Sequence, residues 1–226
     1  SDCLVGSEMC IRDRFLAYWR KNLPEVITGW NSQMYDIPYL AGRINRVLGE
    51  KSMKDLSPWG LVSQDEVYIS GRKNITYDIG GVTQLDYLDL YKRFTYTNQE
   101  SYRLDYIANY ELGEKKLDHD EHDTFREFYT KDWDKFVQYN IIDVQLVDKL
   151  EDKLKLIELA ITMAFDAKVN FIDIHYQVRM WDTIIYNYLK KQNIVIPPKK
   201  RTSKSQKYAG AYVKEPKPGK YDWVVS

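Results

Sequence analysis

The sequence predicts an α/β fold. A short β-branched run at residues 25–30 is followed by helical apolar spacing from residue 36, and strand and helix patterns then continue to alternate. At 226 residues, 44% apolar and 29% charged, the chain has the composition of a globular protein with a sizeable core. Its 33 basic and 33 acidic residues cancel, so any nucleic-acid binding must come from a local surface.

Residues 1–14, SDCLVGSEMCIRDR, contain both cysteines, Cys3 and Cys10. This stretch lacks the apolar core and the cleavage site of a signal peptide, and we interpret it as a translated sequencing adapter that is left out of fold prediction. A disulfide loop is the alternative, which we disfavour because nothing else indicates an exported protein. No apolar stretch approaches the roughly 20 residues of a membrane-spanning helix, so we expect a soluble, cytoplasmic protein without a membrane partner.

The first predicted elements are a strand that precedes Asp36 and a helix that begins near it. EVITGW (25–30) lies between turn-forming residues and predicts a buried strand. The segment after it has apolar residues at helical spacing and predicts a helix that begins near Asp36 and ends at Gly49. Pro38 fits the first turn, where the missing N–H costs nothing.

Further elements follow in order along the chain. Residues 67–79 predict a β-hairpin with a polar, cationic tip, and VTQLDYLDLYKRF predicts a strand that passes into a short helix. A second helix should end at Gly113, and from Lys131 the pattern is helical for about sixty residues. Residues 190–214 are basic without an acidic residue, which indicates a cationic linker.

Asp143 lies in the predicted helix WDKFVQYNIIDVQLVDKL, which carries two apolar stripes. Neighbours should therefore surround this helix on most sides, and an ionised Asp143 must be paired, hydrogen-bonded or metal-bound. Tyr139 lies one turn earlier on the same face. Asp36 could instead be a helix N-cap, and Asp143 could accept a hydrogen bond from a tyrosine or the backbone. The stripes are Trp133, Phe136, Val137, Ile141, Val144 and Val147, and Tyr139, Ile142, Leu146 and Leu150.

Two short motifs resemble those of a known family. WNSQMYD resembles the second exonuclease motif of family B DNA polymerases, and YNIID resembles their third. The likeness continues through GEKSMKDLSPWG, LDYLDLYKRFTYTN, WDTIIYN and GAYVKEPKPG, covers nearly everything after residue 15, and is greatest to replicative polymerases of T-even-like phages. An ordered series of this kind is more specific than either motif alone.

The resemblance implies a ribonuclease-H-like (DnaQ-like) 3′–5′ exonuclease fold. Such domains use two divalent metal ions, Mg²⁺ or Mn²⁺, to hydrolyse the terminal phosphodiester of DNA. By the family pattern, Asp36 and Asp143 are the metal-site carboxylates, and Tyr139 helps to position the attacking water. These three residues are the expected catalytic group.

The resemblance also implies DNA-binding residues. Asn31 and Tyr35 would line the pocket for a single-stranded 3′ end, where aromatic stacking tolerates any sequence. Arg72 and Lys73 of the predicted hairpin would face DNA phosphates, although an ordinary solvated hairpin is equally compatible with the sequence. LDHDEHD (117–123) could suggest a metal cluster, but we interpret it as a solvated acidic loop because it lacks ligand spacing.

The departures from the family pattern limit the expected activity. The first exonuclease motif, Asp-x-Glu, does not occur in the sequence, so we expect a fold that lacks its first strands and negligible nuclease activity from this chain alone. The expected organisation is an exonuclease domain at 15–189, a basic linker at 190–207 and the start of a polymerase palm at 208–226. Tyr208 and Gly210 resemble a template-contacting Tyr-x-Gly-Gly/Ala motif.

The expected parent protein is a DNA-directed DNA polymerase with proofreading. It would act on primer-template DNA and dNTPs, together with a sliding clamp and other replisome proteins, in the cytoplasm of a host cell if it is phage-encoded. Two alternatives remain open, namely a stand-alone DnaQ-like nuclease and a catalytically inactive nucleic-acid-binding module. The neighbouring sequence would discriminate among them.

Overall fold

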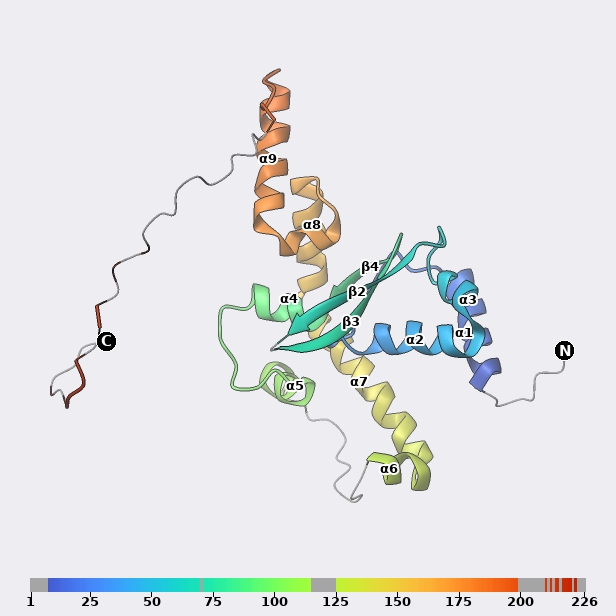
Figure 1. The fold of residues 1–226 in the computed structure, drawn as a ribbon. Coiled ribbons are helices and arrows are strands. Elements are labelled where there is room, and N and C mark those ends of the chain that lie inside the picture. Colours follow the sequence, from blue (N-terminus) through green and yellow to red (C-terminus); the bar gives the residue numbers. More distant parts are fainter. Residues whose placement is uncertain are drawn as a thin grey trace.

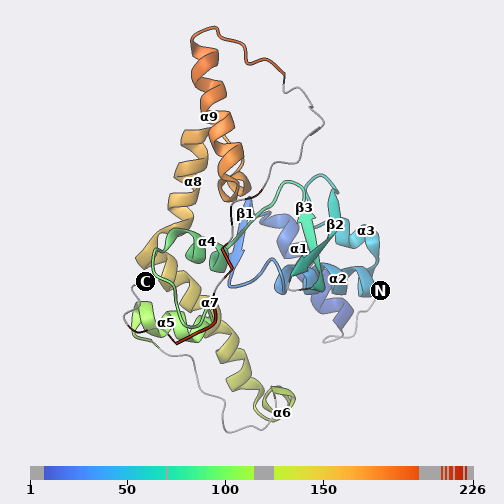
Figure 2. The ribbon, with the colours of Figure 1, turned by 60° about the vertical axis from the view of Figure 1, so that its left-hand side comes forward.

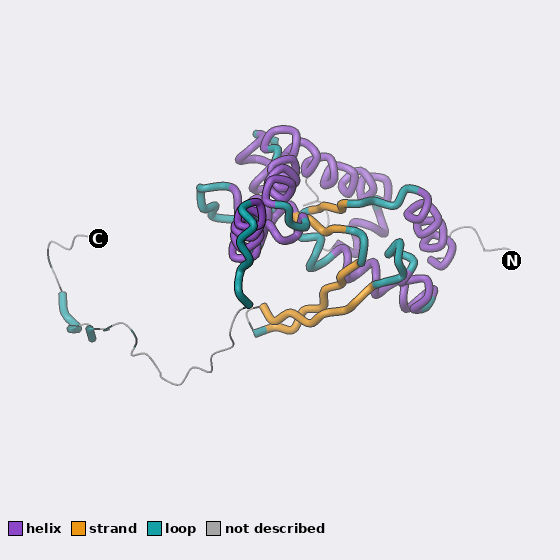
Figure 3. The backbone as a smooth tube through the Cα atoms, turned by 90° about the horizontal axis from the view of Figure 1, so that it is seen from above, coloured by secondary structure: helices purple, strands orange, loops and turns teal. Residues whose placement is uncertain are grey.

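The computed structural model describes residues 8–69, 71–114, 125–198 and part of 210–222, and it confirms the predicted α/β class. Helices surround two separate two-stranded sheets (Figures 1 and 3). The strands are β1 (Val26–Gly29), β2 (Val62–Ile69), β3 (Arg72–Ile79) and β4 (Thr83–Asp86). The helices are α1 (Glu8–Lys21), α2 (Asp36–Leu48), α3 (Glu50–Lys54), α4 (Tyr87–Phe94), α5 (Leu104–Leu112), α6 (Phe125–Lys131), α7 (Trp133–Leu154), α8 (Leu156–Ala167), the 3₁₀ helix η1 (Phe171–His175) and α9 (Gln177–Lys191).

The parallel pair of β1 and β4 connects the part of the molecule that contains α1–α3 and the hairpin to the helical part that begins at α4. Its register places Gly29 opposite Asp86 at the carboxyl ends of both strands. The strand predicted at residues 25–30 is confirmed, but its side chains are half-buried or exposed rather than buried, because among the described residues it pairs with β4 alone. From this edge the chain enters α2, which ends at Gly49 as the sequence predicts.

The antiparallel hairpin of β2 and β3 confirms the prediction for residues 67–79, although β2 begins earlier, at Val62. The base of the hairpin packs on α2 through Tyr77 and Ile79, and its far end projects from the body (Figure 3). Arg72 and Lys73 are the first residues of β3, beside the turn. The side chain of Arg72 lies outside the described part of the structure.

Helix α1 begins inside the segment that the sequence analysis left out. Cys10 and Leu16 of this helix are buried, and its Glu8 carboxylate accepts hydrogen bonds from Arg12 and from Arg43 of α2. Residues 8–14 therefore belong to the fold, and the prediction that excluded them was wrong. Their non-native origin stays a prediction. Cys10 is disulfide-bonded, contrary to the expectation that disfavoured a disulfide.

The helical half follows its predicted boundaries. Helix α5 ends at Gly113, which adopts φ 72°, and helices follow Lys131 as expected. Figures 1 and 2 show α7 and α8 following one another along the long axis, with α9 beside α8 and extending beyond it. The prediction that neighbours surround α7 on most sides was wrong, since most of its first apolar stripe is exposed, with Trp133 60% and Val144 71% exposed, and Val147 is its buried member.

Two separate clusters of buried side chains hold these elements together. One joins α4, α5, α7, α8 and η1 to β4, and the other joins α1, α2, α3 and the hairpin. The buried members of the first are Leu85, Tyr87, Leu90, Tyr91, Leu104, Ile107, Ala108, Leu146, Val147, Leu150, Leu156, Ala160, Ala164 and Ile174. Those of the second are Leu16, Ile37, Ala41, Ile44, Met53, Leu56, Tyr77, Ile79 and Val82.

Several predictions fall on parts of the chain outside the described residues. Tyr208 and the acidic loop 117–123 are among them, as is the second half of the basic linker 190–207. Gly210 is described and exposed, and the described residues between 210 and 222 contain no strand. None of the helices in the described ranges is long and apolar enough to span a membrane.

Candidate functional site

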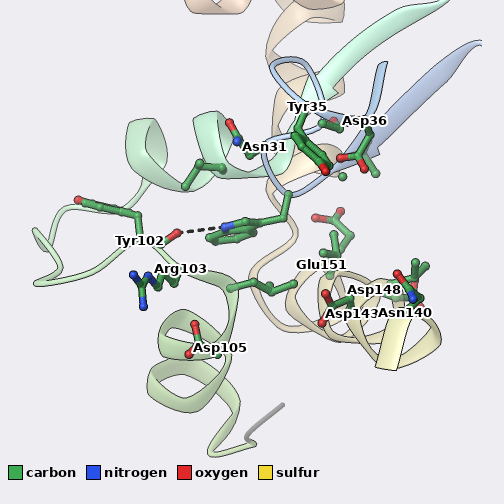
Figure 4. Close-up of a pocket in the computed structure, with 18 of the residues that line it drawn as sticks. Asn31, Tyr35, Asp36, Tyr102, Arg103, Asp105, Asn140, Asp143, Asp148 and Glu151 are labelled. Atoms are coloured by element: carbon green, nitrogen blue, oxygen red, sulfur yellow. Dashed lines mark hydrogen bonds between the residues drawn. The ribbon is translucent and has the colours of Figure 1, made fainter. Parts of the chain in front are cut away.

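An open cleft of about 1800 Å³ lies where the β1–α2 connection, α5 and α7 meet (Figure 4). It brings together five residues that the sequence analysis selected from two distant motifs. Figure 4 shows Asn31, Tyr35 and Asp36 on one side and Asp143 of α7 on the other. The selected residues that line the cleft are Asn31, Tyr35, Asp36, Tyr139 and Asp143.

A tight turn carries the first motif from β1 into α2. Asn31 has φ 62°, a left-handed conformation that asparagine tolerates better than most residues. The backbone N–H groups of Met34 and Tyr35 both donate to the Asn31 carbonyl, at 3.3 and 3.2 Å. The turn therefore delivers Asp36 directly to the start of the helix.

Asp36 is the first residue of α2, and the N-cap position belongs to Tyr35, which makes no side-chain capping hydrogen bond. The interpretation of Asp36 as an N-cap is therefore wrong. Its side chain is exposed to the cleft, yet the surrounding walls desolvate it enough to raise its pKa above the usual value. A carboxylate in this position is open to a ligand in the cleft.

Helix α7 supplies the opposite wall. Tyr139 and Asp143 lie one turn apart on it, and the ring of Tyr139 meets the buried ring of Phe128 edge to face, with centroids 5.9 Å apart. Asp148 and Glu151 continue this acidic wall, and the sequence analysis missed both. Their position on the same helix, within about two turns after the YNIID motif, was the available signal.

Glu151 already serves a structural purpose. Its carboxylate accepts hydrogen bonds from the backbone N–H groups of Ile157 and Glu158, at 3.0 and 3.3 Å, in the first turn of α8. The carboxylate also raises the pKa of the buried Tyr87 hydroxyl, an effect that adds to the larger one of burial. We therefore assign Glu151 to the junction between α7 and α8.

Aromatic and polar residues line the remaining wall. The indole N–H of Trp30 donates to the Tyr102 carbonyl at 3.0 Å, which joins the end of β1 to the segment before α5 (Figure 4). Arg103 and Asp105 follow at the start of α5. Tyr39, one turn after Tyr35 on α2, also lines the cleft and was not selected from the sequence, although its helical spacing from Tyr35 was a signal.

Two further selected residues that the structure describes, Lys73 and Gly210, do not line the cleft. Lys73 belongs to the hairpin, where its ammonium group lies 2.5 Å from a carboxylate oxygen of Glu66. Gly210 likewise is not among the residues that line the cleft. The structure therefore groups the two exonuclease-like motifs and leaves the hairpin as a separate surface.

The acidic residues of the cleft fit part of a metal site. Carboxylate oxygens are the ligands that Mg²⁺ and Mn²⁺ prefer, and Asp36 and Asp143 present them from opposite walls. Within the described ranges, however, no three acidic, histidine or cysteine side chains gather closely enough to hold a metal ion.

A mixed α/β domain with a cleft lined by aspartates and tyrosines has the features of a nuclease domain. The comparison with known families agrees, since residues 5–107 match the model of the DNA polymerase family B exonuclease domain. The chain belongs to the family B DNA polymerases and represents an exonuclease-domain region of them. Exonuclease domains of this family generally use divalent metal ions.

Similar proteins include two phage polymerases. The chain is 40% identical to the DNA-directed DNA polymerase of Escherichia phage RB69, over 94% of this chain and 23% of that protein. It is 37% identical to the DNA-directed DNA polymerase of Enterobacteria phage T4, over 95% of this chain and 24% of that protein. The DNA polymerase delta catalytic subunit of Candida albicans is 29% identical over 99% of this chain and 23% of its own length. The chain thus spans about a quarter of the curated relatives it matches.

Proposed function

We propose that the cleft is a ribonuclease-H-like 3′–5′ exonuclease site that binds the single-stranded 3′ end of DNA. The observation that carries this proposal is the meeting of Asp36 and Asp143, from elements far apart in sequence, in one cleft with Tyr139. A nuclease of this type needs oxygen ligands on two sides of a phosphodiester, and these walls supply them.

Asp36 and Asp143 would hold divalent metal ions, Mg²⁺ or Mn²⁺. When bound, such ions activate a water molecule and stabilise the leaving oxygen of the phosphodiester. Asp36 must be deprotonated to bind a metal, and the raised pKa makes its affinity for metal increase as the pH rises. Tyr139, held by Phe128, would orient the attacking water through its hydroxyl. Because the Asp-x-Glu carboxylates are absent from this sequence, we expect negligible nuclease activity from the chain alone.

The DNA would follow the aromatic side of the cleft. Asn31 and Tyr35 would contact the terminal nucleotides, and unpaired bases can stack on exposed tyrosines whatever their sequence. Arg72 and Lys73 of the hairpin would contact DNA phosphates outside the cleft, and Tyr208 and Gly210 would contact the template. The basic linker 190–207 would add backbone contacts that weaken with salt.

In the parent protein the activity would be DNA synthesis with proofreading. Its substrates would be primer-template DNA and dNTPs, with a sliding clamp and other replisome proteins as partners. The polymerase relatives support this proposal, since the likeness to them covers nearly the whole chain. The proposed organisation is an exonuclease domain that includes helix α1 and extends to residue 189, followed by a basic linker at 190–207 and a palm beginning at 208.

The test uses the full-length polymerase that contains this chain, with Asp36→Ala and Asp143→Ala. We expect loss of the Mg²⁺-dependent excision of a mismatched 3′ nucleotide, while primer extension stays largely intact. Asp152→Ala is the matched control, because Asp152 lies on the same helix α7 but does not line the cleft. Equal loss of excision and extension would show instead that the two aspartates support the fold.

A further inference from the structure

A buried carboxylate from another strand holds the turn that precedes Asp36. The Asp86 Oδ1 atom accepts a hydrogen bond from the backbone N–H of Asn31 at 2.9 Å, and Oδ2 accepts one from Gln33 at 3.0 Å. Oδ1 also accepts from the Leu88 N–H at 3.0 Å, so Asp86 is the N-cap of α4. Only 4% of Asp86 is exposed, and these three N–H groups solvate the carboxylate in place of water.

The turn needs such a partner because of its conformation. The left-handed Asn31 turns its N–H, together with that of Gln33, toward the end of β4. The β1–β4 register, with Gly29 opposite Asp86, places the carboxylate beside these groups. Ser32 between them is buried. Two part-buried N–H groups without an acceptor would carry a desolvation penalty, so Asp86 favours this turn over alternatives.

Capping alone does not require an aspartate at this position. Serine caps a helix about as well as aspartate, but its single oxygen lies too close to the backbone to accept from a second chain segment as well. A carboxylate has two oxygens with four acceptor positions, and its hydrogen bonds are stronger than those of a neutral acceptor. The arrangement of Asp86 therefore exceeds what α4 needs and serves the neighbouring turn.

We propose that Asp86 is a positioning residue, which fixes the turn at residues 31–33 and thereby directs Asp36 into the cleft. The effect on Asp36 follows because α2 begins at Asp36, only a short segment after the turn. This inference rests on the proposed function of the cleft for its meaning, but its structural content can be tested separately. Asp86 does not line the cleft and needs no contact with DNA.

The first test is Asp86→Ser in the 226-residue chain, which keeps a capping oxygen for α4 and removes the acceptors of the turn. We expect the amide hydrogens of Asn31 and Gln33 to exchange at least about fivefold faster, which is the effect of losing one hydrogen bond, and Leu88 to change less. Asp89→Ser, in the same first turn of α4, is the matched control, because Asp89 makes no hydrogen bond to residues 31–33 in the described structure. Unchanged exchange at Asn31 and Gln33 would overturn the inference.

Asp86→Asn covers the case in which the serine variant does not fold. Asparagine keeps the shape and one accepting oxygen, but its amide group faces the N–H of one turn residue and cannot accept. Faster exchange should therefore be confined to one of the two amides, Gln33 if the oxygen retains Asn31 and Leu88. Exchange rates equal to those of the unsubstituted chain at both amides would again contradict a positioning role.

The second measurement follows Asp36 itself, through the broadening of its backbone amide signal by Mn²⁺. In the Asp86 variants that fold, we expect this broadening to fall at least about fivefold relative to the unsubstituted chain, whereas broadening at Asp143 should persist. Equal broadening of Asp36 in both chains would overturn the claim that Asp86 directs Asp36. If the unsubstituted chain shows no Mn²⁺ broadening at either aspartate, the proposal that Asp36 and Asp143 hold a metal ion fails for this chain, while amide exchange still decides whether Asp86 fixes the turn.

Discussion

Gly29 and Ser32 approach so closely that a β-carbon built on Gly29 would lie 2.9 Å from the β-carbon of Ser32. Real side chains do not reach this separation, so the neighbour would have to move. Ser32 is buried and lies between Asn31 and Gln33, whose backbone N–H groups donate hydrogen bonds to Asp86. The last residue of β1 therefore has to be small for the turn to close over it.

Gly29→Ala should destabilise the chain by about 1–3 kcal/mol, the usual range for overpacking a close contact. The measurement is urea denaturation of the two chains. Gly42→Ala, within helix α2, is the matched control. Outside the backbone of its own helix, a β-carbon on Gly42 would have one neighbour among the described residues, the Tyr77 hydroxyl, at an ordinary contact distance of 3.9 Å. That change should stabilise by about 0.5–1 kcal/mol, because alanine favours a helix over glycine. Equal effects of both changes would contradict the close contact.

Glu8 gives the chain a stability that depends on pH. Its hydrogen bonds with Arg43 and then with Arg12 lower its pKa from 4.5 to about 2 in the folded chain. The folded state therefore binds fewer protons, and the ion pair contributes fully above about pH 4.5 and is lost as the pH falls toward 2. We expect Glu8→Gln to lower the melting temperature at pH 6 and to have no effect near pH 2. A difference that stays constant across this range would mean that the charge of Glu8 is not involved.

Tyr39 should add to the binding of single-stranded DNA. It is 58% exposed and lines the cleft beside Tyr35, and stacking on a base contributes about 1–3 kcal/mol per aromatic side chain. Tyr39→Ala should therefore weaken the binding of a short oligothymidine, measured by fluorescence anisotropy. Tyr110→Ala is the matched control, because Tyr110 is 56% exposed and lies outside the cleft. Equal weakening by both changes would place the DNA elsewhere.

The hairpin prediction can be tested through its ion pair. Lys73 and Glu66 lie on adjacent strands, and each side chain is about half exposed. If Lys73 contacts a phosphate, Lys73→Ala should reduce the slope of log affinity against log salt by about 0.7 for a single strand, and Glu66→Gln should raise affinity at low salt. Lys54→Ala removes a comparable pair with Glu50 on α3 and serves as the control. A slope that falls equally in both lysine variants would refute a specific hairpin contact.

The sequence predicts best where a signal is local. The strand at 25–30, the ends of α2 at Gly49 and of α5 at Gly113, and the hairpin follow from nearby glycine, proline and β-branched residues. The prediction that Asp36 and Asp143 lie in one site came from the family resemblance, because their separation along the chain does not give their distance in the fold.

Long-range relationships are what the sequence could not show. The apolar periodicity of α7 is real, but it does not reveal which stripe finds a partner, and Val144 faces outward. Asp86 was not selected because its two bonds to the turn depend on the β1–β4 register rather than on adjacent residues. Helix α1 was missed for a different reason. Residues 1–14 were left out of fold prediction because they were interpreted as non-native, but a non-native segment can still form a helix.

The two buried clusters have a consequence for how the site comes together. Asp36 extends from the cluster built on α2 and the hairpin, and Asp143 extends from α7, whose buried residues belong to the other cluster. The β1–β4 ladder and the carboxylate of Asp86 join these two bodies next to the cleft. The distance between the two aspartates therefore depends on how this junction holds the two bodies together. A change that weakens this junction would separate the two aspartates while each body stays folded. The activity of the site would then be lost before the melting temperature falls.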